Sequence, residues 1–165
     1  MKTVGQRDGG SFILSKLMKS KETLLNQIQS LLQSQLFGVL ATQGVEYPYC
    51  SLVGYLVSED AKSIYFPTIR ETQKFRNICA SPRVSLLVNN QTNQANDLLV
   101  AQALTVLGIA TEVGQDCRDD VLALYLKKYP SLKEFVTAPN CALIKIQVEK
   151  YILVTNFQQV VEYTL

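Results

Sequence analysis

Residues 63–89 read SIYFPTIRETQKFRNICASPRVSLLVN, and this stretch sets the architecture of the chain. Ser63 to Pro67 predicts a short strand, and about Thr72 to Ala80 predicts a helix. That helix must stop near Ser81, because the ring of Pro82 disfavours a helical residue before it. Val84 to Asn89 is rich in valine and leucine and predicts the next strand. Strand, short helix and strand therefore follow one another closely.

Further elements flank this stretch on both sides. An amphipathic helix is predicted from about Lys21 to Gln35, and residues 1–20 are expected to form a mobile tail before it. A second helix is predicted over Cys117–Tyr129, with Asp116 as its N-cap. Residues 157–163 are expected to be extended or part of an interface. The remaining predicted strands are Phe37–Thr42, Tyr47–Val57, Leu98–Val113 with a bulge at Gly108, and Cys141–Val154.

These elements predict a mostly β chain of the α+β class, with six antiparallel strands in a closed or partly closed barrel. The first three strands come at hairpin spacing and predict a meander. Residues 21–165 are expected to form one domain. Both faces of Tyr49–Val57 carry apolar residues, and a second copy of the chain is the simplest cover for such a surface.

The amino-acid composition excludes several kinds of catalytic chemistry but does not identify the reaction. The 165 residues include no histidine and no tryptophan. Histidine is the commonest general base and metal ligand, so its absence excludes Ser-His and Cys-His nucleophile pairs. The net charge of +2 is too balanced for a protein that mainly grips a nucleic-acid backbone. An enzyme with this composition is expected to take its reactivity from a bound cofactor.

The cysteines predict neither a disulfide framework nor a metal site. Cys50, Cys79, Cys117 and Cys141 form no CxxC pair, and without histidine a zinc site is not expected. We expect four reduced, mostly buried thiols. The sequence shows no signal peptide and no apolar run that approaches the ~18 residues of a membrane span. A cytoplasmic protein that does not engage membranes is therefore expected.

The segment from Thr68 to Asn77 predicts an anion site. The end of a strand leads through a polar loop to a helix N-terminus, whose free N–H groups suit a phosphate. Hydroxyl donors come from Thr68 and Thr72, and three cations follow within seven residues: Arg70, Lys74 and Arg76. On spacing alone, a solvated basic helix with a threonine cap explains the segment equally well.

The order of motifs resembles the FMN-binding split β-barrel family related to pyridoxamine 5'-phosphate oxidase. The most specific motif is SPRVSLLV at residues 81–88. The others are FGVLAT at 37–42, YPYCSLV at 47–53, IYFPT at 64–68, TQKFRNI at 72–78 and VLGIA at 106–110. The resemblance implies a six-stranded antiparallel split barrel that dimerises and binds FMN at the dimer interface. It implies a flavin-dependent oxidoreductase whose substrate stays unknown.

Site residues follow from the same resemblance. Ser51, Leu52 and Val53 match positions that run along the flavin ring, and Pro67 and Thr68 match positions near the ring and the ribityl chain. Thr72, Gln73 and Lys74 match the phosphate-binding segment, with Lys74 as the main charge partner, and Asn77 matches a residue that supports this segment. No catalytic acid or base and no metal ligand is assigned.

Three departures weaken the likeness to the oxidase itself. Ser51 and Gln73 stand where the oxidase has arginine, and Leu56 stands where it has lysine. The C-terminal substrate signature of the oxidase uses arginine, histidine and tryptophan, so vitamin B6 oxidation is not expected. Alternatives are the same cleft holding the deazaflavin F420 or haem, and a cofactor-free binding or regulatory dimer.

Overall fold

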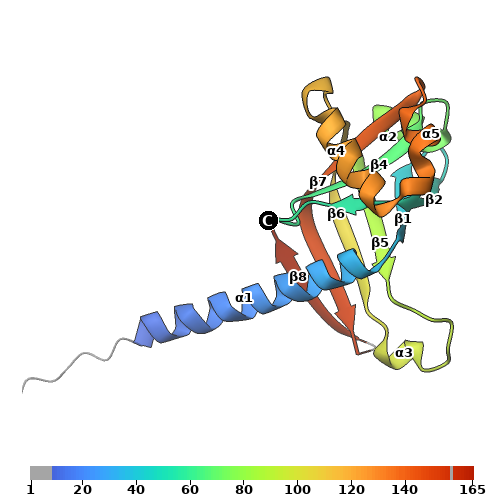
Figure 1. Cartoon of the computed structure of the whole chain (residues 1–165). Coiled ribbons are helices and arrows are strands. Elements are labelled where there is room, and N and C mark those ends of the chain that lie inside the picture. Colours follow the sequence, from blue (N-terminus) through green and yellow to red (C-terminus); the bar gives the residue numbers. More distant parts are fainter. Residues whose placement is uncertain (1–8, 157) are drawn as a thin grey trace, which may run out of the picture.

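One curled antiparallel sheet dominates the computed structural model, which describes residues 9–156 and 158–165, with side chains from Lys19 onward (Figure 1). The strand order is β2-β1-β5-β6-β7-β4-β3, and β8 pairs with β7 off this path. The predicted mostly β class and split-barrel architecture are confirmed, with eight strands in place of six. The strands are β1 (Phe37–Gln43), β2 (Pro48–Gly54), β3 (Leu56–Val57), β4 (Ser63–Ile69), β5 (Arg83–Asn89), β6 (Ala103–Glu112), β7 (Cys141–Thr155) and β8 (Gln159–Thr164).

Helices cover the two ends of the sheet. In Figure 1, α2, α4 and α5 gather at the end near β2 and β4, whereas α3 lies at the opposite end. Ile28, Leu31 and Leu32 of α1 are buried against the main core, as the predicted apolar stripe requires. The helical segments are α1 (Gly9–Ser34), α2 (Gln73–Ala80), α3 (Asp97–Val100), α4 (Gln115–Lys128), the 3₁₀ turn η1 (Pro130–Leu132) and α5 (Lys133–Thr137).

The first helix begins earlier than predicted. It starts at Gly9 rather than near Lys21, so the second half of the predicted tail is helical. No glycine or proline separates Ser11 from Lys21, and the helix therefore continues unbroken toward the N-terminus. Residues 1–8 of the predicted tail lie outside the described residues.

The predicted meander of the first three strands is wrong. β1 pairs with β2, but β4 pairs with β3 and β7 instead of with β2. The predicted strand over Tyr47–Val57 is interrupted at Tyr55, which is fully buried. Burial of this ring redirects the chain, so that β2 and β3 lie at opposite ends of the strand order.

Two other element boundaries differ from the prediction. Residues 97–100 form α3 instead of the start of a strand, because the Asp97 carboxylate accepts the N–H groups of Thr92 and Gln94 and folds the loop back. The N-cap of α4 is Gly114, so Asp116 lies in the first turn of the helix. There its negative charge still complements the helix dipole.

The predicted bulge at Gly108 is confirmed. The β6–β7 register shifts between Leu107 and Gly108. A Cβ at this position would overlap the Gln147 carbonyl oxygen and approach Ile146 Cγ2 to 2.8 Å. Only glycine therefore lets the two strands approach this closely.

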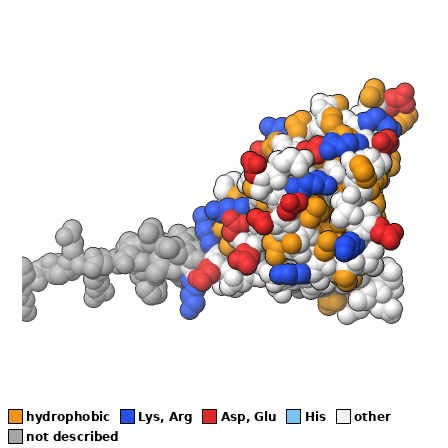
Figure 2. Space-filling model, turned by 45° about the horizontal axis from the view of Figure 1, so that its top comes forward, with side chains coloured by type: hydrophobic (Ala, Val, Ile, Leu, Met, Phe, Trp, Pro, Cys, Tyr) orange, Lys and Arg blue, Asp and Glu red, His pale blue; other side chains and the backbone are white. Residues whose placement is uncertain are grey.

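The prediction of mostly buried cysteines is wrong. Cys50, Cys79 and Cys117 are exposed, Cys141 is buried, and all four are free thiols. Basic and acidic side chains are mixed over the face shown in Figure 2, with hydrophobic side chains between them. No helix in the described part of the chain is both long and apolar enough to cross a membrane.

Candidate functional site

A pocket of about 220 Å³ opens where β2, the end of β4 and the start of α2 meet. β2 and β4 are far apart in the strand order, so the curl of the sheet brings their residues together. Six of the nine predicted cofactor residues line this pocket: Leu52, Val53, Pro67, Thr68, Thr72 and Lys74. We call it the Lys74 pocket, because Lys74 is the only charged residue among those that line it.

Two threonines fix the junction between β4 and α2. Thr72 is the N-cap of α2, and its hydroxyl accepts the Phe75 N–H and donates to the Ile69 carbonyl at 2.8 Å. The Thr68 and Thr72 hydroxyl oxygens lie 3.0 Å apart. Thr68 is buried and lines the pocket. The predicted threonine cap is confirmed, and it directs the first N–H groups of α2 toward the pocket entrance.

Lys74 lies within the first turn of α2 and is partly buried. Burial lowers the pKa of its ammonium group from the ordinary lysine value. Among the described residues, no acidic side chain forms an ion pair with Lys74. A partly desolvated cation beside a helix N-terminus is an electrostatic arrangement that a bound anion stabilises.

The other two cations of the segment are engaged elsewhere. Arg70 forms an ion pair with Glu112, and its guanidinium lies 5.5 Å from the centre of the Phe75 ring. Arg76 donates to the Glu71 carbonyl at 2.6 Å and to the Gln73 side chain at 2.9 Å. Neither lines the Lys74 pocket, so the three-cation cluster predicted from spacing contributes one pocket cation.

Gln73 and Asn77 belong to a neighbouring network and not to the pocket lining. The Gln73 amide donates to Asn77 Oδ1 at 2.7 Å, and the Asn77 amide donates to the Thr42 hydroxyl at 3.0 Å. Asn77 and Thr42 are both buried, so this network ties α2 to β1. The Asn77 side chain therefore links α2 to β1 next to the pocket.

Ser51 carries an unsatisfied hydroxyl. Its Oγ is the one buried side-chain oxygen or nitrogen in the described part of the chain that has no hydrogen-bond partner. Ser51 pairs with Leu40 and Val53 with Gly38, so the two side chains share one face of β2. Val53 lines the Lys74 pocket, whereas Ser51 is not among its lining residues.

The opposite wall of the pocket comes from residues that the sequence analysis did not assign to a site. Tyr125 of α4, Leu132 of η1 and Phe135 of α5 close this side. Tyr125 is buried, and its hydroxyl donates to the Gly54 carbonyl at 3.2 Å. Gly54 and Ile69 complete the lining. None of these five residues falls within the motifs quoted above, so the sequence analysis did not assign them to the site.

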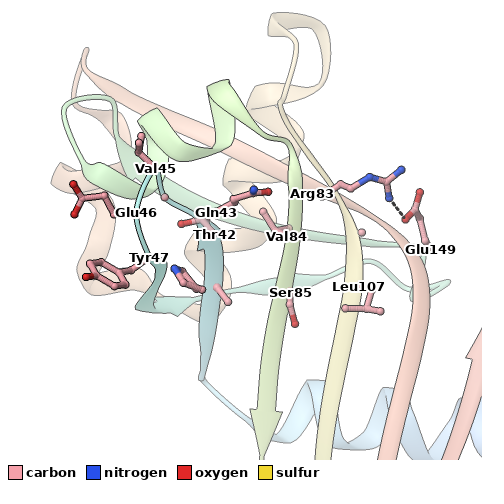
Figure 3. A pocket seen from close by; sticks show the side chains of 14 residues that line it. Thr42, Gln43, Val45, Glu46, Tyr47, Arg83, Val84, Ser85, Leu107 and Glu149 are labelled. Carbon is pink, nitrogen blue, oxygen red and sulfur yellow. Dashed lines mark hydrogen bonds and ion pairs between the residues drawn. The ribbon is translucent and has the colours of Figure 1, made fainter.

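A larger pocket, of about 630 Å³, lies elsewhere, between the β1–β2 turn and residues of β5, β6 and β7 (Figure 3). Arg83 and Glu149 stand at one end and pair with each other at 3.4 Å. Tyr47 stands at the other end and is exposed. Glu46 also lines this pocket, whose lining contains none of the predicted cofactor residues, so its size alone does not favour it as the site.

A sequence model of the pyridoxamine 5'-phosphate oxidase family matches residues 24–155, which is most of the chain. The chain belongs to this family. The motifs quoted above fall within the match, and so do all lining residues of the Lys74 pocket. No curated protein gives a significant sequence match.

Solved structures of family relatives share this fold. ChuZ from Campylobacter jejuni superposes with a TM-score of 0.76 at 16% identity, over 97% of this chain and 70% of its own. A haem-binding protein from Mycobacterium smegmatis gives a TM-score of 0.73 at 19% identity, over 81% of this chain, which spans 55% of that protein. A FAD-binding protein from Mesorhizobium loti gives 0.61 at 16% identity, over 76% of this chain and 89% of its own. These relatives therefore differ in the groups that they bind.

The residues of the Lys74 pocket fit a phosphorylated flavin. Lys74 and the first turn of α2 match a phosphate. Leu52, Val53 and Pro67 supply apolar surface. The described residues contain no cluster of three or more His, Cys, Asp or Glu.

Proposed function

We propose that this protein is an FMN-dependent oxidoreductase that anchors the cofactor by its phosphate in the Lys74 pocket. One observation carries the proposal. Lys74 is the single charged residue of the lining, has no acidic partner among the described residues, and stands with two threonine hydroxyls at the start of α2. Such a combination of donors suits a phosphate monoester better than it suits a neutral or cationic ligand.

Each group of residues has a defined task in this proposal. Lys74 pairs with the phosphate, and the first N–H groups of α2, whose N-cap is Thr72, donate to its oxygens. Leu52 and Pro67 hold the ring from its apolar side and exclude water. When bound, the flavin ring supplies the electron transfer. Burial raises the pKa of Tyr125, so its phenol remains protonated and acts as a wall and a donor to Gly54, not as a base.

A homodimer is part of the proposal. Val39 pairs with Leu52 on one side and Leu87 on the other, so these side chains lie in one row on the outer face of the sheet. All three are exposed, as is Phe37 at the start of β1. We call this surface the outer apolar row. Monomeric proteins seldom expose contiguous apolar surface, and a second copy covers it by symmetry.

The outer apolar row also connects with the pocket. Leu52 belongs to the row, lines the Lys74 pocket and is 67% exposed. A flavin ring that extends out of the pocket beside Leu52 would therefore lie on the surface that the second copy of the chain covers. This places each proposed site at the boundary between two chains, with the phosphate held inside one of them.

The test is a visible absorbance spectrum of the purified protein before and after loading with FMN and desalting. Retained flavin bands support the proposal. A Soret band in the purified protein would instead identify haem, and an F420 band would identify the deazaflavin. A flat spectrum after loading would favour a cofactor-free dimer and contradict the proposal. Pyridoxamine 5'-phosphate oxidation itself is not proposed, because the chain has neither histidine nor tryptophan.

A further inference from the structure

A further pocket, of about 530 Å³, lies between β3 and the middle of α4. We call it the Leu124 pocket, after the α4 residue that lines it and is 50% exposed. It shares no lining residue with the Lys74 pocket, which is lined by the next residue of α4, Tyr125. α4 therefore separates two pockets. The volume of the Leu124 pocket falls within the range of roughly 300–1,000 Å³ that small-molecule sites occupy.

The walls of the Leu124 pocket are mainly apolar. β3 contributes Leu56 and Val57, β4 contributes Tyr65, and α4 contributes Val121 and Leu124. The first four side chains are half-buried and Leu124 is exposed, so apolar surface stays uncovered here. A ligand with an apolar body would remove this surface from water, and that burial favours binding.

Anchors at both ends hold α4 in place over the pocket. Near the start of the helix, Arg118 Nη2 donates to the Cys141 carbonyl of β7 at 2.9 Å. At its end, Lys128 Nζ donates to the Tyr55 carbonyl at 3.2 Å. The two α4 residues that line the pocket lie between these anchors. The pocket is therefore a gap beneath a fixed helix, and it exists before any ligand arrives.

The rim of the Leu124 pocket includes an acidic turn between β3 and β4. Glu59 and Asp60 are the only charged residues that line the pocket. Asp60 Oδ1 accepts the Ser58 hydroxyl at 2.7 Å and the Lys62 N–H at 3.0 Å, and these bonds lower the pKa of this carboxyl from its ordinary value. The Glu59 carbonyl accepts the Gln29 side chain of α1 at 2.9 Å. The turn is thereby fixed, with an ionised carboxylate beside the apolar walls.

No basic residue neutralises this rim from within the pocket. Among the described residues, neither Glu59 nor Asp60 forms an ion pair. Lys62 lies close enough to attract the Asp60 carboxylate but does not line the pocket, and Lys128 is directed toward the Tyr55 carbonyl. The lining consequently attracts a positive charge and repels a negative one.

We propose that the Leu124 pocket binds a small organic cation, namely an amine with an aromatic or branched apolar body. The body packs between β3, Tyr65 and α4, and the ammonium group faces Glu59 and Asp60 at the rim. The proposal does not depend on a flavin, because the two pockets share no lining residue. The Lys74 pocket, whose single charged residue is a cation, selects ligands of the opposite sign.

Titration of the full-length, ¹⁵N-labelled protein with 2-phenylethylamine, followed by NMR, tests the proposal. The amide signals of residues 56–60 and 121–124 should shift to saturation, whereas those of residues 72–74 should not. The alcohol 2-phenylethanol has the same body without the charge and should bind about threefold or more weakly. The anion 3-phenylpropionate should give no saturable shift of the same signals.

Two variants separate the charge from the apolar wall. Glu59→Gln should weaken the amine about threefold and leave the alcohol unchanged, because the turn uses the Glu59 carbonyl and not its carboxylate. Glu134→Gln, at an exposed position on α5 outside the lining, is the control and should change neither. Leu124→Ala should weaken both ligands about threefold or more. Its control is Leu98→Ala, at a leucine on α3 that is 72% exposed.

The outcomes also distinguish this inference from the proposed function. Equal affinity for the amine and the alcohol, or equal loss of both in a folded Glu59→Gln variant, would overturn the inference. Absence of saturable amine binding, or shifts confined to residues outside the Leu124 pocket, would overturn it as well. A colourless protein that retains no FMN but binds the amine at residues 56–60 and 121–124 would contradict the proposed function and support this inference.

Discussion

Tyr129 illustrates how single residues decide the local geometry of the site. Its hydroxyl lies 2.6 Å from the Leu36 carbonyl and 2.8 Å from the Tyr55 carbonyl, and it accepts the Tyr55 N–H. The side chain of this residue, the C-cap of α4, thereby satisfies backbone groups between α1 and β1 and at the interruption between β2 and β3. The irregular chain at Tyr55 stays buried because these polar groups find partners.

Tyr129→Phe should lower the free energy of unfolding by about 1–3 kcal/mol, because the buried Tyr55 N–H loses its acceptor while the ring remains. Urea titration followed by circular dichroism measures the change. Tyr47→Phe is the control, since Tyr47 is 77% exposed and its hydroxyl has no described partner in the core; it should stay within about 0.5 kcal/mol. Equal stability of the two variants would show that the Tyr129 hydroxyl contributes nothing.

Single residues also show which features of the site the sequence could not predict. The spacing identified the β4–α2 junction and its threonine cap, because capping depends on local geometry. It did not separate Lys74, which lines the pocket, from Arg70 and Arg76, which bind neighbouring groups. Those partners are Glu112 and the Glu71 carbonyl. A tertiary contact such as Arg70–Glu112 leaves no mark in the local sequence.

Among the secondary-structure elements, β6 and β7 approach each other closely at the bulge because residue 108 is glycine. Gly108→Ala should destabilise the fold by about 1–3 kcal/mol or more, because the added methyl group meets the Gln147 carbonyl and the Ile146 side chain. Thermal and urea unfolding both report the loss.

Gly114→Ala provides the matched control for this glycine. A Cβ at Gly114 meets nothing within 4 Å, and its φ of −63° suits alanine. The free energy of unfolding should therefore change by no more than about 1 kcal/mol. If Gly108→Ala proved as mild as Gly114→Ala, the close packing of β6 against β7 at the bulge would be contradicted.

Elements with a strong local pattern were predicted well, and those set by distant contacts were not. β1, β5 and α2 agree with their predicted ranges within a residue or two, because hydrophobic period, Thr72 and Pro82 define them locally. The Tyr55 interruption depends on α4, and α3 depends on the Asp97 carboxylate, so neither follows from periodicity. The meander failed for the same reason, since strand order is a property of the whole sheet.

At the scale of the whole molecule, the outer apolar row predicts a dimer. Light scattering should give twice the chain mass of 18.4 kDa for the unmodified protein. Val39→Lys should shift the mass to a single chain, because it places a charge at the centre of the row, between Leu52 and Leu87.

Val160→Lys is the control for this experiment. Val160 lies on β8, outside the row, and is 59% exposed. This variant should keep the dimer mass, and circular dichroism should show both variants folded. If the unmodified chain is a folded monomer, or if the Val39→Lys variant is still a dimer, the outer apolar row is not the dimer interface.

The central claim is that the Lys74 pocket holds a phosphate, and Lys74→Ala tests it most directly. Isothermal titration of this variant with FMN and riboflavin isolates the phosphate contact, with Lys127→Ala, an exposed lysine on α4, as the control. Loss of a charge-assisted bond worth about 1.5–3 kcal/mol should weaken FMN roughly tenfold or more and leave riboflavin nearly unchanged. Equal weakening of FMN and riboflavin, or no FMN binding by the unmodified chain, would contradict the account.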